Sequence, residues 1–200
     1  MIAFQYNKTS LQHLEKQLKM RQRTLPIIKS KESALRVEVK KCKDEMELHD
    51  EEYARLLEQY RDLFVLWNEF NPSLVKTGKL SIGRKKVAGV MVPVLEDAEF
   101  VVAPYSLFGS PKWFADGIEL LKKMAMTAIS RDLLNRKLRL LEVARKKTTQ
   151  KVNLFEKVQI PGYQDAIRKI KRFMEDEENL SKSSQKILKS LLEQREEVTV

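Results

Sequence analysis

Two glycines in "GKLSIGRKK", Gly78 and Gly83, have the spacing of a phosphate-binding loop of the Walker A type. Such a loop requires Lys and then Ser or Thr directly after its second glycine, because the ammonium contacts the phosphates and the hydroxyl binds Mg²⁺. Arg84 and Lys85 occupy these two positions. The stretch is therefore interpreted as a basic loop and not as a nucleotide-binding site.

The other residues that could do chemistry are isolated from one another. His13 and His49 have no second metal ligand four residues further on, and no cysteine is their neighbour. The acidic run 175–178 would not converge on one point, because helix neighbours one or two residues apart do not face each other. We interpret it as a solvated face, Cys42 as a packing residue and His49 as a partly buried, hydrogen-bonded histidine. We expect no catalytic residue, no metal site and no cofactor.

The composition favours long helices over a sheet. One third of the 200 residues are charged, and only six are glycine. A chain that is rich in Lys, Glu, Leu and Arg and poor in turn residues is typical of long helices or coiled coils. The formal charge of +10 permits an acidic partner, which is either nucleic acid or an acidic protein surface.

The cellular compartment is also indicated by composition. A single cysteine excludes an internal disulfide and is usual for a reducing compartment. No apolar run approaches the roughly 20 residues that a bilayer-spanning helix needs. The start "MIAFQYNKTS" lacks the basic residues and apolar stretch of a signal peptide. We expect a soluble, cytoplasmic protein.

A seam of alternating three- and four-residue steps runs through the first third of the chain. The residues of this seam are largely apolar, with the exceptions of Arg21, Glu32 and His49. A period of 3.5 residues predicts a coiled coil, since the helices must supercoil to keep such a stripe facing a partner. The seam positions are Leu11, Leu14, Leu18, Arg21, Leu25, Ile28, Glu32, Leu35, Val39, Cys42, Met46, His49, Tyr53, Leu56, Tyr60, Leu63 and Trp67.

Local signals place the ends of this first helix. Thr9 and Gln12 have the spacing of a capping box, which predicts a start. Asn71 before Pro72 predicts the end, because the residue before a proline is disfavoured in helical conformation. A helix of this length cannot bury its own apolar stripe, so it requires a partner helix.

The last third of the chain supplies that partner. Ser110 and Pro111 form a plausible cap and first-turn pair. Pro161 and Gly162 interrupt the pattern, but apolar spacing resumes after them, which predicts a kink inside a continuing helix. The apolar positions are Ile118, Leu121, Leu134, Leu138, Leu141, Val152, Phe155, Ile167, Ile170, Phe173, Leu180, Ile187 and Leu191.

Charge distribution predicts an antiparallel arrangement of the two helices. Residues 44–58 are predominantly acidic. Folding the chain back about residue 92 places them beside Arg131, Arg136, Lys137 and Arg139. Exposed ion pairs contribute only a few tenths of a kcal/mol each, so they select orientation more than they stabilise the pair.

Between the helices the sequence becomes rich in Val, Phe, Gly and Pro. Residues 87–95 and 99–103 read as two short strands joined by a turn at "EDA". The predicted fold is therefore all-α: a long antiparallel two-helix coiled coil of residues 1–71 and 111–200, with a small β-hairpin or irregular head at 72–110.

Several motifs then point to a family. The stretch "VNLFEKVQIP" resembles the V-N-A-L-E-x-x-x-I-P signature of the D subunit of the V-type (archaeal-type) ATPases. Leu154 and Phe155 replace the usual Ala and Leu, which implies a different local fit. The matching residues are Val152, Asn153, Glu156, Ile160 and Pro161.

Three further segments extend the resemblance in the same order along the whole chain. Asn7 and Thr9 are placed like the opening N-P-T of that family, with Lys8 in place of Pro. "IIKSKESAL" (27–35) is similar to L-L-K-x-K-x-x-x-L, and "VAGVMVP" (87–93) to V-x-G-V-x-V-P. Leu25 and Pro26 stand where the family often has Gly-His, so we expect a bend near Pro26.

The resemblance implies a central rotor shaft without catalytic residues. In that family the terminal ends of the long helices enter the hexamer of nucleotide-binding A and B subunits, and the F subunit clasps the shaft partway along. The lower end sits on the funnel-shaped C or d subunit that caps the membrane ring. Membrane association is then expected only through partners. We expect the basic faces near the termini to contact acidic walls of the hexamer, through Arg21, Arg23, Lys29, Lys31, Lys169 and Arg172.

Two alternatives from other classes stay open. The coiled-coil rotor-like component of flagellar and secretion ATPases has a related architecture, but would lack the head that contains "VAGVMVP". A basic coiled-coil arm that binds nucleic acid is the second. The basic runs lack interleaved exposed aromatic residues and any recognisable reading module, so nucleic acid is not the expected partner.

Overall fold

The computed structural model describes residues 2–61, 65–106 and 109–198, and it divides into two compact units. Unit 1 comprises Met1–Ser30 and Thr149–Val200, and unit 2 comprises Lys31–Thr148. The helices α1 (Lys8–Gln59) and α3 (Phe114–Asn153) each contribute to both units. The chain is mostly helical, as the composition predicts.

Helix α1 begins two residues earlier than the predicted capping box implies. The backbone N–H of Ser10 donates to Asn7 Oδ1 at 2.6 Å, so Asn7 caps the first turn. The prediction of Thr9 as the cap was therefore wrong. Pro26 lies inside α1 and does not end it.

Helix α1 ends at Gln59, well before Asn71. Two short 3₁₀ helices follow, η1 (Leu66–Glu69) and η2 (Pro72–Leu74). Asn71 caps η2 by accepting a hydrogen bond from the N–H of Ser73 at 3.0 Å. Asn71 and Pro72 thus do mark a helix boundary, but the boundary is the start of η2 and not the end of α1.

The predicted seam of α1 faces the interior. Every described seam residue from Leu11 to Tyr60 is buried or half-buried, including the polar members. Glu32 is only 9% exposed, and its carboxylate accepts from Arg36 Nε at 2.6 Å. Leu63, and the side chain of Trp67, lie outside the described residues.

In unit 2 the ion pairs between α1 and α3 have the antiparallel register that was predicted. Lys137 Nζ lies 2.9 Å from Glu45 Oε2, and Arg131 Nε lies 2.7 Å from Asp50 Oδ1. Arg136 instead pairs with Asp132 on its own helix. Helix α3 begins at Phe114, whose N–H donates to the carbonyl of Pro111, so Ser110 and Pro111 precede the helix and do not start it.

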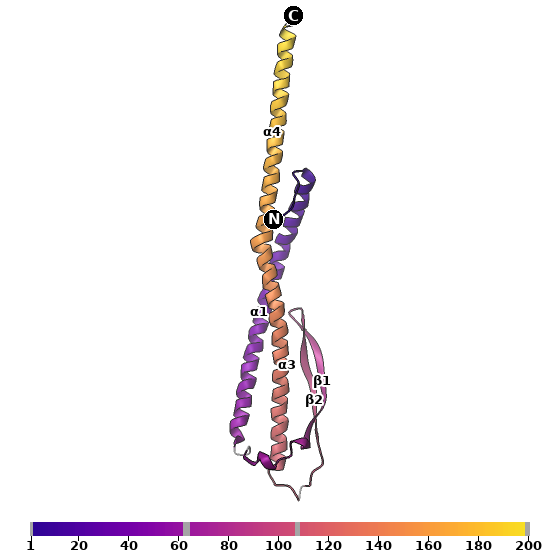
Figure 1. Ribbon diagram of the computed structural model, residues 1–200, viewed down its shortest axis with the longest axis vertical. Helices are drawn as coiled ribbons and strands as arrows, with labels where there is room; N and C mark the ends of the chain where they lie inside the picture. Colours follow the sequence, from indigo (N-terminus) through magenta and orange to yellow (C-terminus); the bar gives the residue numbers. More distant parts are fainter. Residues whose placement is uncertain (1, 62–64, 107–108, 199–200) are drawn as a thin grey trace. The chain divides into compact units, whose positions relative to one another are not determined.

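The head of unit 2 is a hairpin of two strands, β1 (Val75–Val87) and β2 (Val90–Val102), which lies beside α3 (Figure 1). Val87 pairs with Val90, which leaves Ala88 and Gly89 as a two-residue turn. Both have positive φ, +47° and +80°, as a turn of type I′ requires.

The predicted turn at "EDA" was therefore wrong. Glu96, Asp97 and Ala98 lie inside β2, where the register shifts between the Ser81 and Ile82 pairs. Such a shift marks a β-bulge, which uses the same polar and small residues as a turn. The strand predicted over 87–95 instead spans the true turn.

The tip of the hairpin closes a small apolar core. The tip cluster consists of five buried residues from α1, β2 and α3, and Val87, Ala88 and Val90 pack against it. Three elements contribute to it, because two helices alone would leave one side of their apolar seam exposed to water. The five residues are Leu35, Val39, Cys42, Val92 and Leu141.

A second apolar cluster lies at the base of unit 2. Phe70, Phe114 and Ile118 are buried there, with Trp113 and Tyr105 against them. The ring centroids of Phe70 and Phe114 are 5.2 Å apart, within the usual range for aromatic pairs. This cluster connects the start of α3 to the segment between α1 and the hairpin.

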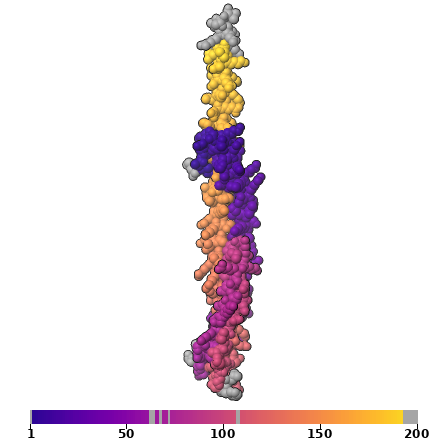
Figure 2. Space-filling view, turned by 90° about the vertical axis from the view of Figure 1, so that its right-hand side faces the viewer, coloured from indigo at the N-terminus to yellow at the C-terminus, as the bar shows by residue number. Residues whose placement is uncertain are grey.

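Unit 1 has its own core, in which Leu14 of α1 packs against Ala166, Ile167 and Ile170 of α4 (Ile160–Val198). The distal part of α4 is different. Apolar residues from Leu180 to Leu192 are exposed, by 72% at Leu180 and 53% at Leu192. In Figure 2 the yellow end of α4 has no other described segment of unit 1 against it.

That exposure corrects the predicted seam beyond Phe173. The spacing of Leu180, Ile187 and Leu191 gives a helical stripe, but among the described residues nothing in unit 1 covers it. Across the described ranges, the helices lack an apolar stretch of the length that a lipid bilayer requires.

Candidate functional site at the π-helical junction

The segment that carries the family signature is a break in the regular helix. We call residues 152–163 the junction. Helix α3 ends at Asn153, a π-helical segment η3 (Leu154–Gln159) follows, and α4 starts at Ile160. The N–H of Ile160 donates to the carbonyl of Phe155, five residues back instead of four. The chain thus stays helical through Pro161, as predicted.

The wider turn explains how a helix accommodates Pro161. A proline has no N–H to donate, and its ring crowds the carbonyl four residues earlier, which here belongs to Lys157. A π-helical turn immediately before the proline already departs from the i to i−4 hydrogen bonds. The sequence signal of Pro161 and Gly162 indicated an irregularity but not its type.

Arg21 of α1 contacts the junction through a hydrogen bond and two aromatic rings. Its Nε donates to Gln159 Oε1 at 2.8 Å, and its Nη1 donates to Gln17 Oε1 at 2.5 Å. The guanidinium carbon lies 4.5 Å from the ring centroid of Tyr163 and 6.0 Å from that of Phe155. A half-buried guanidinium held by two amides and two aromatic rings is fixed in position.

A second contact joins α1 to the π-helical segment. Lys29 Nζ lies 2.8 Å from Glu156 Oε1, with each side chain about half exposed at 46%. At that exposure the pair contributes well under 1 kcal/mol. Its main effect is on register, because it holds one side of η3 to α1.

The N-terminal strap, residues 2–6, reaches the C-terminal end of the junction at Gly162. A Cβ on Gly162 would lie 3.1 Å from Ile2 Cδ1, so glycine leaves the space that Ile2 fills. The rings of Tyr6 and Phe173 have centroids 4.8 Å apart. The strap therefore runs along α4 from Gly162 towards Phe173, and packs on the core of unit 1.

The family-motif residues take different places in this arrangement. Glu156 forms the ion pair with Lys29, and Ile160 carries the π-type hydrogen bond. Val152 is half-buried, while Asn153 and Pro161 are exposed. Asn153 sits at the cap position of η3 without a capping hydrogen bond from its side chain.

The six basic residues expected to contact a hexamer are not equivalent. Arg21 and Lys29 contact residues of the junction, and Lys169 Nζ lies 3.2 Å from Asp165 Oδ2 on its own helix. Arg23 and Arg172 are exposed on α1 and α4. Lys31 belongs to unit 2, where its side chain lies next to Gly89 of the hairpin turn.

The junction also contains contact residues that the sequence reasoning missed. These are Gln159 and Tyr163, which recur at four-residue spacing with Phe155, a residue predicted only as an apolar position, and this spacing places all three on one helix face. That spacing, and an arginine in an otherwise apolar seam at position 21, were the available signals. Ile2 had no such signal, because its contact depends on a strap without regular structure.

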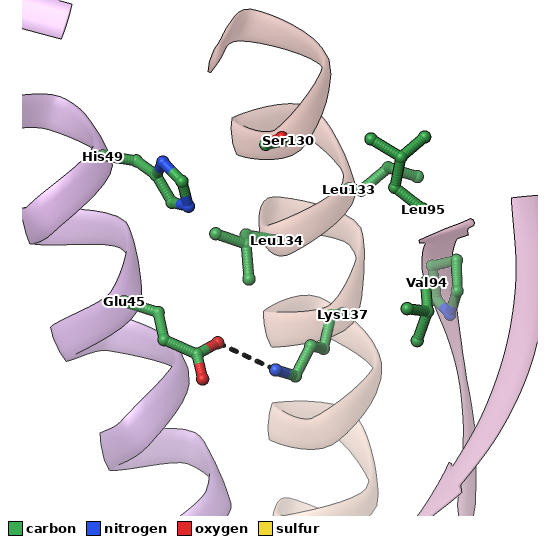
Figure 3. A pocket seen from close by; sticks show the side chains of 9 residues that line it. Glu45, His49, Val94, Leu95, Ser130, Leu133, Leu134 and Lys137 are labelled. Atoms are coloured by element: carbon green, nitrogen blue, oxygen red, sulfur yellow. Dashed lines mark hydrogen bonds and ion pairs between the residues drawn. The ribbon is translucent and has the colours of Figure 1, made fainter. Parts of the chain in front are cut away.

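Unit 2 contains a cavity of about 250 Å³ between α1, α3 and β2 (Figure 3). Leu133, Leu134 and Leu95 line its apolar part, and the Glu45–Lys137 ion pair closes one side. His49 points into the same space (Figure 3). The carboxylate of Glu45 and the ammonium of Lys137 are therefore paired with each other, beside the imidazole of His49.

His49 and Cys42 occupy the seam as packing residues. His49 is partly buried, as predicted, but its Nδ1 has no hydrogen-bond partner among the described residues and lies 3.4 Å from Glu52 Oε2. Burial raises the pKa of the Cys42 thiol, which lies 3.6 Å from the carbonyl oxygen of Leu134. A buried thiol with a raised pKa is a poor nucleophile.

The acidic run 175–178 is a solvated face. Its side chains are exposed, and Glu178 Oε1 lies 2.6 Å from Lys182 Nζ one turn later. That hydrogen bond lowers the pKa of Glu178. Over the described parts of the chain, no group of three or more His, Cys, Asp or Glu side chains is placed to hold a metal ion.

Comparison with known proteins gives one consistent result. The sequence profile of the family of ATP synthase D subunits matches residues 10–190. A relative from Borreliella burgdorferi, a V-type ATP synthase D subunit, is 29% identical over 194 residues, which cover 96% of each chain. A protein of the same description from Chlamydia pneumoniae is 27% identical over 188 residues, which cover 91% of this chain and 90% of its own.

Proposed function

The chain belongs to the family of ATP synthase D subunits, and from this premise we propose that it is the central stalk of a V-type ATPase or ATP synthase. In this role it is a non-catalytic rotor shaft that transmits torque between the nucleotide-binding hexamer and the membrane ring. The family match over most of the chain carries the proposal. Long helices with buried seams are consistent with it.

The proposed partners are the other subunits of such a complex. They are the nucleotide-binding A and B subunits, the F subunit, and the C or d subunit that caps the membrane ring. The protein would be cytoplasmic and peripheral to the membrane, attached only through these partners.

We further propose that α1 pairs with α3 and α4 as an antiparallel two-stranded coiled coil. Two observations support this pairing. The seam of α1 is buried or half-buried at 3.5-residue spacing, and ion pairs join α1 to α3 in unit 2 and to η3 in unit 1. A coiled coil suits torque transmission, because it presents a different face in each direction and needs no chemically reactive residue.

The exposed basic residues are proposed to contact acidic walls of the hexamer. Arg23 and Arg172 are the best placed of the six, because both are exposed in unit 1, whereas Lys29 and Lys169 there are engaged in ion pairs. Reversing Arg23, Lys169 and Arg172 together should weaken assembly or lower coupled ATP turnover. Unchanged assembly and turnover would reject these contacts.

The direct test of the function is purification from the native cell with an affinity tag on this chain. We expect recovery of two different nucleotide-binding subunits in a complex with ATPase activity. Recovery with RNA or DNA, with an affinity that falls steeply as salt rises, would overturn the proposal in favour of a nucleic-acid-binding arm. Recovery with a flagellar or secretion ATPase would likewise overturn it, and the hairpin head argues against that outcome.

A further inference from the structure

We propose that Arg21 locks the register of α1 against the π-helical junction, so that the two helices of unit 1 turn as one body under load. The inference rests on the shaft function proposed above. It assigns Arg21 a positioning role inside the shaft, in place of the contact with a partner that its charge alone predicts.

The contacts of Arg21 span the whole irregular segment. Phe155 lies within η3, Gln159 is its last residue, and Tyr163 lies one turn into α4. One guanidinium contacts all three, with the Nε to Gln159 Oε1 hydrogen bond at 2.8 Å and the Tyr163 ring centroid at 4.5 Å. Gln17, one turn earlier on α1, holds the opposite edge of the guanidinium. Arg21 therefore contacts residues at both ends of the π-helical turn, so its contacts depend on where that turn lies along the chain.

Apolar contacts alone would fix that position weakly. A π-helical turn contains one residue more than the helical pattern on either side of it, and the hydrogen-bond pattern could place that extra residue earlier or later in the segment. Each residue advances about 100° around the helix axis. A displacement of the π-helical turn by one residue would thus carry Gln159 away from Arg21 Nε and break the hydrogen bond.

Arginine is required for this role, and lysine is not equivalent. The planar guanidinium stacks on Tyr163 while its edge donates to two amide oxygens. A lysine ammonium would keep the charge but lose the stacking and one of the two directed hydrogen bonds. Arg23 lies two residues further along the same helix and is exposed, so it provides a control of the same charge for the exchange measurement on the purified chain.

The test uses the whole ATPase complex with Arg21→Lys, Arg21→Ala, Arg23→Lys or Arg23→Ala in this chain. In vesicles, we expect both Arg21 variants to lower the number of ions transported per ATP hydrolysed, while ATP hydrolysis and assembly persist. On the purified chain, hydrogen exchange at the amides of residues 154–160 should accelerate roughly tenfold in both Arg21 variants. Both Arg23 variants should match the wild type in exchange.

Two outcomes would overturn the lock. Arg21→Lys could behave as wild type while Arg21→Ala loses coupling, which would identify a simple charge contact with an acidic partner. Exchange at 154–160 could also stay unchanged in both Arg21 variants. Should Arg21→Ala fail to fold, Gln159→Ala removes the acceptor of the Nε hydrogen bond and must accelerate exchange at the same amides for the lock to stand.

Failure of the shaft function would be recognised separately. A wild-type chain that does not assemble with nucleotide-binding subunits rejects the proposed function. The exchange measurement on the isolated chain needs no partner, and it still decides whether Arg21 fixes the π-helical turn.

Discussion

The tip cluster of unit 2 and the junction of unit 1 both hold α1 to a returning helix, but they use opposite chemistry. At the tip cluster, Leu35, Cys42 and Leu141 are fully buried, and the hairpin covers the third side. At the junction, a half-buried guanidinium, two amides and two rings form the contact, and the ion pair beside them is half exposed.

This difference indicates that the stability of the helix pair and the alignment of its helices depend on different kinds of contact. Burial of apolar area is strong and non-directional, so it holds the helices together without specifying how they are aligned along their axes. Hydrogen bonds and stacking contribute less free energy, but each requires one geometry. We therefore expect substitutions in the tip cluster to reduce the free energy of unfolding, and substitutions in the junction to affect mainly alignment.

The largest expected effect is in the tip cluster. Leu35→Ala removes a side chain that is fully buried, and should lower the free energy of unfolding by about 2 to 5 kcal/mol. Urea unfolding followed by circular dichroism measures the change. Leu140→Ala on α3, where the side chain is 44% exposed, is the control and should change the value by less than about 1 kcal/mol. Equal losses for the two variants would show that the tip cluster is not the main core.

The next effect concerns the turn that brings the hairpin onto the tip cluster. Gly89→Ala places a Cβ at a φ of +80°, which costs about 1 to 2 kcal/mol. The loss should appear as a lower unfolding midpoint in the same experiment. Gly109→Ala is the matched control, because its Cβ would meet Ser106 at an ordinary 3.4 Å. A hairpin that contributes nothing to the core would give no difference between the two alanines.

A smaller effect is expected for the coupling energies of two ion pairs, one from each region. Double-mutant cycles on Glu45 with Lys137, and on Lys29 with Glu156, measure the coupling energy of each pair. Lys137 is 19% exposed and Lys29 is 46% exposed, so we expect about 1 kcal/mol for the first pair and about 0.3 kcal/mol for the second. A larger coupling at Lys29 would contradict the view that the junction contributes little to stability.

The smallest effect is a pH dependence in unit 1. Hydrogen bonds from Arg168 and Lys169 lower the pKa of Asp165. A carboxyl whose pKa is lower in the folded state stabilises the fold above its unfolded pKa, and this contribution is lost as the pH falls through the folded pKa. Asp165→Asn should therefore lower the thermal midpoint slightly at pH 7, with the difference vanishing in acid. Glu175→Gln is the exposed control, and a constant difference at all pH values would argue against the Asp165 contribution.

Much of the helical arrangement could be predicted from the residues alone. Leu14, Leu35, Val39 and Cys42 are buried because a 3.5-residue stripe must face a partner, whatever that partner is. Opposite charges at Glu45 and Lys137 then indicated the antiparallel direction. These features depend on spacing and charge, which the sequence displays directly.

Other features depend on contacts that the spacing of residues in the sequence does not reveal. Ala88 is not a typical turn residue, yet it lies in the hairpin turn. The residues at 96–98 are typical of a turn, yet they lie at a β-bulge inside β2. The stripe from Leu180 to Leu192 has the same periodicity as the buried stripe, yet it is exposed, because periodicity does not say where a partner segment ends. In the junction, Arg21 was recognised as basic, but its stacking on Tyr163 depends on the π-helical turn.

The extra residue of η3 also has a consequence for insertions and deletions. Removing one residue within 154–159 would allow an ordinary α-helix to form from Val152 onwards, without any loss of helical hydrogen bonds. Because the wide turn accommodates the extra residue, the residues after such a deletion would keep about the same orientation relative to Val152. Ile167 and Ile170 would therefore stay in the core of unit 1. Removing one residue from the regular part of α4 before Ile167 would instead rotate both by about 100°, and neighbouring positions would replace them. The position of a deletion relative to η3 thus decides whether the inner face of α4 changes.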